Sequence, residues 1–111
     1  MNYWTNLFTP ETYEAFSHSD QSVSGFQESQ RTTADRVVPG DRFICYMVRM
    51  SRWIGVLEVL EGPFIDRSPI FVPEDDPFVV RFKVKPLVWL PLEQTIAIRD
   101  EEVFTHLRIR P

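Results

Sequence analysis

Cysteine, histidine and lysine are scarce in this chain of 111 residues, and each scarcity narrows what the protein can do. The single cysteine, Cys45, cannot form an internal disulfide, and its place in the apolar run 43–48 predicts a buried, unreactive thiol. This pattern favours a reducing compartment, so we expect a cytoplasmic protein. No apolar run approaches the roughly 20 residues that cross a bilayer, so we expect no membrane contact.

The residue patterns that mark common enzymes and metal sites are also missing. The sequence has no GxSxG, no P-loop, no HExxH and no Cys/His cluster with the spacing of zinc ligands. The two histidines, His18 and His106, lie far apart and are typical of surface positions. We therefore expect no catalytic residue, no metal and no cofactor, and a binding protein is favoured over an enzyme.

Arginine accounts for ten of the twelve basic residues, although the net charge is −4. Residues 27–56 carry five arginines and three acids, a net charge of +2, while the rest of the chain carries −6. The planar guanidinium group suits bidentate contacts with phosphate. We expect Arg31, Arg49 and Arg52 to contact a phosphate backbone; a solvated surface of mixed charge is the alternative.

Hydrophobic patterning predicts short strands with a few short helices. Strands are expected over residues 3–8, 42–48, 53–61 and 78–84, and helices after the Thr9-Pro10 start signal, over 29–36 and over 100–107. A polar loop is expected over 17–24 and an irregular connection over 64–76. Since no βαβ alternation is present, this pattern indicates a single α+β domain over residues 1–111, mostly antiparallel, in which barrel closure would remove the strand edges.

Aromatic residues gather near the expected turns, at Phe26, Trp53 and Phe78. A pocket for an unpaired base needs flat apolar walls that stack on the ring and a few polar groups that read its edge. Stacking contributes about 1–3 kcal/mol per base. These aromatics therefore predict walls of a base pocket, with ordinary core packing as the alternative for each one taken alone.

Six short segments occur in a particular order along the chain. They are Asn2-Tyr3-Trp4, Ser24-Gly25-Phe26, residues 38–46 (VPGDRFICY), residues 53–59 (WIGVLEV), Pro77-Phe78 and Leu90-Pro91-Leu92. This order and spacing resemble the EVE domain, a member of the PUA-like superfamily to which YTH and ASCH domains also belong. The resemblance extends over most of the chain.

The resemblance implies a PUA-like, small, mostly antiparallel β-barrel with two or three short helices and a concave pocket for a flipped, modified base. It implies a non-catalytic reader of modified DNA or RNA, such as the sensor of a prokaryotic restriction system or of an RNA-processing system. Other domains of a larger effector protein would be further partners. The residues that match the pocket and its border by position are Ser24, Gly25, Phe26, Tyr46, Trp53 and Phe78.

Two other functions stay open on the sequence. The first is a small hydrolase of the ASCH type that acts on a modified nucleoside through a lysine, a threonine or an acid in the same cavity; Lys83 and Lys85 are the available lysines. The second is a protein-interaction module whose exposed aromatic residues meet a partner chain.

Overall fold

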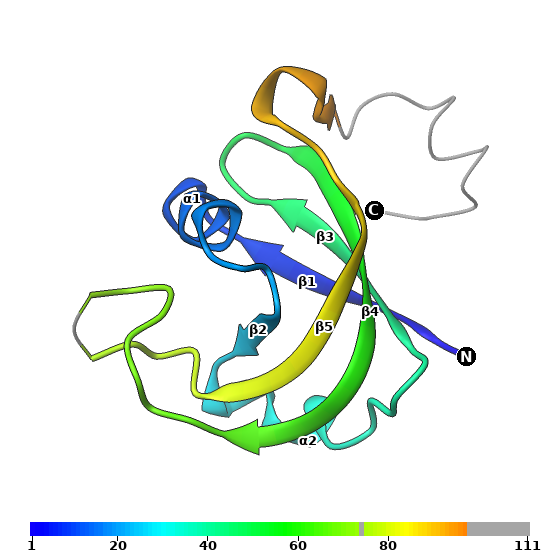
Figure 1. Ribbon diagram of the computed structural model, residues 1–111, viewed down its shortest axis with the longest axis vertical. Helices are drawn as coiled ribbons and strands as arrows, with labels where there is room; N and C mark the ends of the chain where they lie inside the picture. The colour runs from blue at the N-terminus through cyan, green and yellow to red at the C-terminus, as the bar shows by residue number, and fades with distance from the viewer. Residues whose placement is uncertain (74, 98–111) are drawn as a thin grey trace.

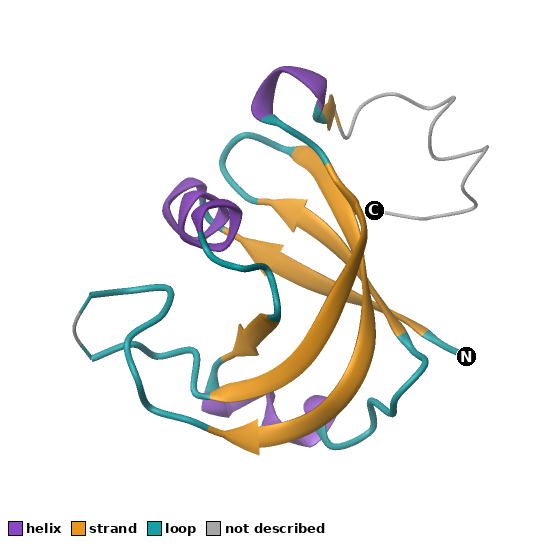
Figure 2. Cartoon of the chain, in the orientation of Figure 1, coloured by secondary structure: helices purple, strands orange, loops and turns teal. Residues whose placement is uncertain are grey.

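A single curled sheet with short helices forms the protein (Figure 1, Figure 2). The computed structural model describes residues 1–73 and 75–97. Its strands are β1 (Tyr3–Phe8), β2 (Val23–Phe26), β3 (Arg42–Met47), β4 (Arg52–Ile65), β5 (Val80–Trp89) and β6 (Ile96–Ala97). Its helices are α1 (Pro10–His18) and α2 (Arg31–Ala34), with 3₁₀ turns at η1 (Glu28–Gln30) and η2 (Leu92–Gln94).

The strand order is β1-β3-β4-β5-β2, with β6 added beside β4. β1 runs parallel to β3, and the remaining pairings are antiparallel. Register shifts within the long strands β4 and β5 bend the sheet, as β-bulges do, until it curls on itself (Figure 1). The expected small, mostly antiparallel α+β architecture is confirmed.

The two end strands of the sheet, β1 and β2, meet through side chains. The amide Nδ2 of Asn6 on β1 donates a hydrogen bond to Oγ of Ser24 on β2, and both residues are buried. No backbone ladder joins β1 to β2 within the described residues. The barrel therefore has a seam between β1 and β2.

Helix α1 begins where the sequence predicts. Thr9 caps the helix by accepting a hydrogen bond from the Thr12 amide, and Pro10 occupies the first helical position. Its buried face carries Tyr13 and Phe16, as expected. Both rings pack against Trp89 of β5, with ring centroids 5.7 and 4.4 Å from it. This packing fixes α1 at the end of β1 (Figure 1).

The middle of the barrel is filled by three phenylalanines from different strands. Phe26, Phe43 and Phe82 meet edge to face, with centroid separations of 5.1–5.9 Å. Cys45 is fully buried in the same core, and burial raises the pKa of its thiol well above the ordinary value. The expectation of a buried cysteine is confirmed.

Some predicted boundaries are wrong. The expected loop over residues 17–24 contains the end of α1 and the start of β2, because pairing with β5 holds even this polar stretch extended. Gly62-Pro63 does not end its strand, since Gly62 adopts φ +126° at a register shift and β4 continues to Ile65. The expected helix over 100–107 lies outside the described residues.

Candidate functional site

A cavity of about 260 Å³ opens at the seam, beside the end of β1. We call it the Phe78 cavity. Pockets for drug-sized ligands hold roughly 300–1,000 Å³, so this volume suits a single heterocycle better than a whole nucleotide. Its lining residues are Leu7, Phe8, Thr9, Gly25, Phe26, Gln27, Ser29, Gln30, Val48 and Phe78.

Phe78 is placed by the connection between β4 and β5. The Asp76 carboxylate accepts hydrogen bonds from the backbone amide of Phe78 (2.9 Å) through Oδ1 and from those of Ile70 (3.0 Å) and Phe71 (2.8 Å) through Oδ2. Burial would raise the pKa of Asp76, but these backbone hydrogen bonds outweigh it and hold the pKa below the ordinary value. The charged carboxylate thus organises the loop that carries Phe78.

Arg81 of β5 also holds this loop through hydrogen bonds. Its guanidinium is fully buried; Nε donates to the carbonyl of Phe78 at 2.9 Å and Nη1 to Oγ of Ser68 at 2.9 Å. Ion pairs with Asp66 (3.3 Å) and Asp76 (3.5 Å) balance its charge. A buried arginine is tolerated only when paired and hydrogen-bonded in this way.

Gly25 allows Phe78 to lie against β2. A Cβ at this position would lie 2.9 Å from the Phe78 carbonyl oxygen and 3.0 Å from both Phe71 Cε2 and Phe78 Cβ. Such contacts are too short, so this strand position requires a residue without a side chain. The requirement comes from the close approach of the loop, because Gly25 itself is in an ordinary strand pairing with Arg81.

The cavity combines an apolar floor with a polar edge. Phe26 is 8% exposed and its ring packs against Phe43 and Phe82, so it forms the floor. Phe78 is only half-buried and can offer a ring face to a ligand. The exposed side chains of Gln27, Ser29 and Gln30 follow along one border, where amide and hydroxyl groups can read the edge of a heterocycle.

Two exposed ion pairs involve residues that are next in sequence to the lining of this cavity. Arg49, next to the lining residue Val48, pairs with Glu11 at 2.9 Å. Arg67 pairs at 2.9 Å with Glu28, which lies between two lining residues. The pKa of Glu11 is lowered by hydrogen bonds from its own backbone amide and the Thr9 side chain, and Arg49 lowers it further. Exposed pairs of this kind contribute little to stability, so both guanidinium groups are available to an anion.

Three of the six expected pocket residues come together in the structure. Gly25, Phe26 and Phe78 line the Phe78 cavity, whereas Ser24 is buried beneath it and bonded to Asn6. Tyr46 and Trp53 lie opposite each other on β3 and β4, with ring centroids 5.4 Å apart. Neither lines this cavity or the second one described below.

The three expected phosphate contacts have different surroundings. Arg49 follows the lining residue Val48 and pairs with Glu11, as described above. Arg31 follows the lining residue Gln30, and its Nε lies 3.7 Å from Oδ1 of Asp35, the residue that follows α2. Arg52 donates to the carbonyl oxygen of Thr95 at 3.0 Å, which directs it toward β6. Their roles toward phosphate remain predictions.

Several residues of this site are not found by sequence reasoning. The end of β1, at Leu7 and Phe8, reads only as a strand, and Arg67 falls in an irregular stretch. The one local signal is Asp76-Pro77-Phe78, because aspartate commonly accepts a hydrogen bond from the amide two residues ahead. The period-2 alternation of residues 78–84 predicts that Arg81 lies on the face of β5 opposite Val80 and Phe82, yet its guanidinium is fully buried.

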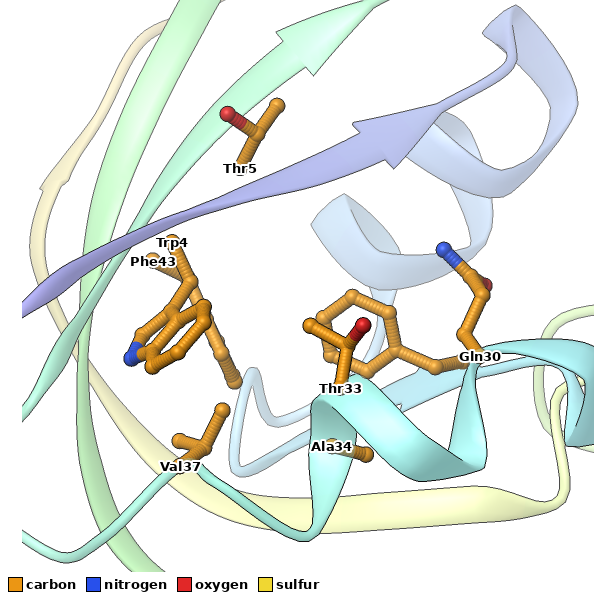
Figure 3. Close-up of a pocket in the computed structure, with 8 residues that line it drawn as sticks. Trp4, Thr5, Gln30, Thr33, Ala34, Val37 and Phe43 are labelled. Atoms are coloured by element: carbon orange, nitrogen blue, oxygen red, sulfur yellow. The ribbon is translucent and has the colours of Figure 1, made fainter.

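A second cavity, of about 250 Å³, lies along the same seam toward the start of β1 (Figure 3). We call it the Trp4 cavity. It shares Phe26 and Gln30 with the Phe78 cavity. Its full lining is Trp4, Thr5, Phe26, Gln30, Thr33, Ala34, Val37 and Phe43.

The two lysines that a hydrolase could use lie outside both cavities. Lys83 and Lys85 are exposed, Lys83 pairs with Glu61 at 3.4 Å, and neither lysine lines the cavities. Among residues 1–73 and 75–97, no three His, Cys, Asp or Glu side chains are grouped as metal ligands would be. None of the helices described there has the length and apolar character needed to span a bilayer.

Comparison with known proteins gives relatives of the sequence and of the fold. No protein-family model matches the chain. The UPF0310 protein of Pyrococcus horikoshii is 27% identical over 99 residues, which cover 78% of this chain and 67% of that protein.

Solved structures with the same fold include YTH domains. A complex of the YTH domain-containing protein Mmi1 with RNA matches at TM-score 0.63 and 12% identity, over 95% of this chain and 66% of that one. The Pho92 YTH domain in complex with m6A matches at TM-score 0.56 and 10% identity, over 77% and 56%. This chain thus spans just under two thirds of the first of these structures and a smaller part of the second. The narrower likeness to EVE domains stays a prediction, and the chain has the fold of the YTH and PUA-like domains.

Proposed function

We propose that this protein is a reader of a modified base in RNA, which it takes into the Phe78 cavity. The observation that carries the proposal is a heterocycle-sized cavity with an aromatic wall at Phe78, an apolar floor at Phe26 and a border of side-chain amides. Such a site stacks on a ring and reads its edge. The shared fold supports the choice of RNA, since one neighbour is a complex with RNA and another with m6A.

Two arginines near the cavity support the proposal that a phosphate backbone binds beside the base. Arg49 follows the lining residue Val48 in sequence, and Arg67 pairs with Glu28, which lies between two lining residues; both arginines pair with exposed glutamates. A phosphate can displace a carboxylate from a guanidinium, because both accept bidentate hydrogen bonds. In this arrangement the cavity gives specificity and the arginines give affinity that depends on salt.

The test compares short single-stranded RNAs that carry N6-methyladenosine or plain adenosine, with matched DNAs, by fluorescence anisotropy at low ionic strength. Burying one methyl group contributes about 0.8 kcal/mol, so we expect roughly fourfold tighter binding of the methylated RNA. Tighter binding of an RNA that carries another modified base would identify that modification as the ligand. Equal affinity for all modified and unmodified strands would refute the proposal.

Variants of the aromatic wall locate the site. Phe78→Ala should weaken binding of the modified RNA by about 1–3 kcal/mol, the contribution of one stacked base. Phe78→Leu keeps apolar bulk but lacks a flat face, and should also lose affinity. Phe64→Ala is the matched control, because Phe64 is likewise half-buried but lines neither cavity. Equal loss in the Phe64 and Phe78 variants would place the base elsewhere.

Nothing in the described residues favours the hydrolase over the reader. Lys83 and Lys85, the lysines that such an enzyme would use, lie outside both cavities. Incubation with modified nucleosides, followed by chromatography, checks this directly. Turnover of any modified nucleoside would show that the protein is an enzyme and would refute the reader hypothesis.

A further inference from the structure

The Trp4 cavity has the features of a second base site. Trp4 and Phe43 form one side and Gln30 and Thr33 the other, with Val37 below (Figure 3). Phe26 is a wall common to this cavity and the Phe78 cavity. The proposed function leaves this space unused, although it has nearly the same volume as the first cavity.

The indole of Trp4 is held in one orientation. Its Nε1 donates to Oδ2 of Asp41 at 2.9 Å, and Oδ1 of the same carboxylate accepts from the backbone amide of Asn2 at 2.9 Å. Asp41 is only 1% exposed, so the acceptor is itself fixed. A wall held in this way loses little conformational entropy when a flat ligand packs against it.

The guanidinium group of Arg36 lies beside the Trp4 ring. The guanidinium of Arg36 lies 5.5 Å from the centroid of the Trp4 ring, a cation–π contact, and the side chain is exposed. Arg36 takes part in no salt bridge within the described residues. An aromatic cavity with an exposed arginine in contact with one of its walls matches the ring and the phosphate of a nucleotide.

The two cavities lie one after the other along β1. The Trp4 cavity contacts β1 at Trp4 and Thr5, and the Phe78 cavity contacts it from Leu7 onward. A strand rises about 3.3 Å per residue, so the two sites are roughly 10 Å apart. This separation suits two bases of one strand, each turned toward the protein.

We propose that the Trp4 cavity binds an unmodified base of the same RNA strand, near the modified base in the Phe78 cavity. This inference rests on the proposed function. It makes the ligand single-stranded, because a duplex would have to release two bases and each release costs about a few kcal/mol.

The test uses a five-nucleotide RNA with N6-methyladenosine in the centre, N6-methyladenosine monophosphate alone, and pentamers with an abasic site at each other position in turn. The intact pentamer should bind roughly five- to 150-fold tighter than the monophosphate, which corresponds to about 1–3 kcal/mol from the second base. One abasic position should remove most of this gain. A duplex with the same modified base should bind more weakly than the single strand.

Thr33→Tyr is the variant that fills the Trp4 cavity, and Thr32→Tyr is its control. Both threonines are exposed on α2, but only Thr33 lines the cavity. Thr33→Tyr should lose the gain of the pentamer and keep the affinity for the monophosphate, while Thr32→Tyr should change neither.

The outcomes separate the two proposals. Pentamers with abasic sites that all bind like the intact pentamer would overturn the second base site, and so would a duplex that binds as tightly as the single strand. In either case a retained preference for the modified monophosphate would leave the proposed function standing. Absence of that preference, with no effect of Phe78→Ala, would overturn the proposed function and the second site with it.

Discussion

Arg81 and Asp76 form a fully buried ion pair, with Nη2 of the arginine 3.5 Å from Oδ2 of the aspartate. Both residues also bond to Phe78, Arg81 through the Phe78 carbonyl and Asp76 through the Phe78 amide. The backbone of the residue that forms the aromatic wall is therefore held on both sides by one pair of charges. The position of Phe78 depends on this pair.

Removal of one member of the pair should disorder the loop and lower the free energy of unfolding. Asp76→Asn leaves the Arg81 charge buried with one partner fewer, and loss of one partner of a buried pair costs about 3–5 kcal/mol. Urea denaturation measures this loss. Asp75→Asn is the matched control, because Asp75 is exposed and its φ of +48° is one that asparagine tolerates. Similar stability of the two variants would contradict the role of the pair.

Gly25→Ala should destabilise the protein and weaken base binding together. The added Cβ meets the Phe78 carbonyl oxygen at 2.9 Å, so the loop must shift away from β2. Overpacking of this kind typically costs about 1–3 kcal/mol. Thermal unfolding and RNA titration of the same samples check both effects, with the exposed substitution Thr32→Ala as control. A variant with full stability and full affinity would show that the close approach does not matter.

Acid should destabilise the protein through Asp41. Hydrogen bonds from the Asn2 amide, the Trp4 indole and the Val38 amide lower the pKa of Asp41 in the folded state. In the unfolded chain the pKa returns to about 3.9, so the unfolded state binds the proton first. The stabilisation is therefore present above that pH and is lost as the pH falls through the lower, folded pKa.

Denaturation curves from pH 7 to pH 2 test this dependence. Asp41→Asn should be less stable than the wild type at pH 7, by about 1–3 kcal/mol for the unsatisfied donors. The difference should shrink as the pH falls and the wild-type carboxyl becomes protonated. Asp35→Asn, at an exposed position, controls for the loss of one negative charge. A difference that stays constant with pH would refute the assignment to Asp41.

Cys45 should be unreactive in the folded protein. Its side chain has no exposure, and burial raises the pKa of the thiol, so little thiolate is present at pH 8. A disulfide reagent such as dithionitrobenzoate should react with one thiol per chain in denaturant and with almost none under native conditions. Fast reaction of the native protein would mean that the core opens readily.

The sequence by itself determined the elements whose signals are local. Thr9 and Pro10 set the start of α1, and the alternation of Val80, Phe82 and Val84 set the buried face of β5, because capping and period-2 patterning depend on neighbours along the chain. Gly25, Phe26 and Phe78 were also marked in advance, by their places in the resemblance and near turns.

Only the tertiary structure decided which of these residues meet. Phe8 and Phe78 are 70 residues apart in sequence and line one cavity, because the curl of β4 and β5 brings β2 up to β1. The same curl buries Arg81, whose pattern alone placed it on the outer face, since its partners Asp66 and Asp76 come from a loop with no periodic signal. Tyr46 and Trp53 lie opposite each other on β3 and β4. The sequence could not show this contact, because the register of the two strands is set by hydrogen bonds between distant parts of the chain.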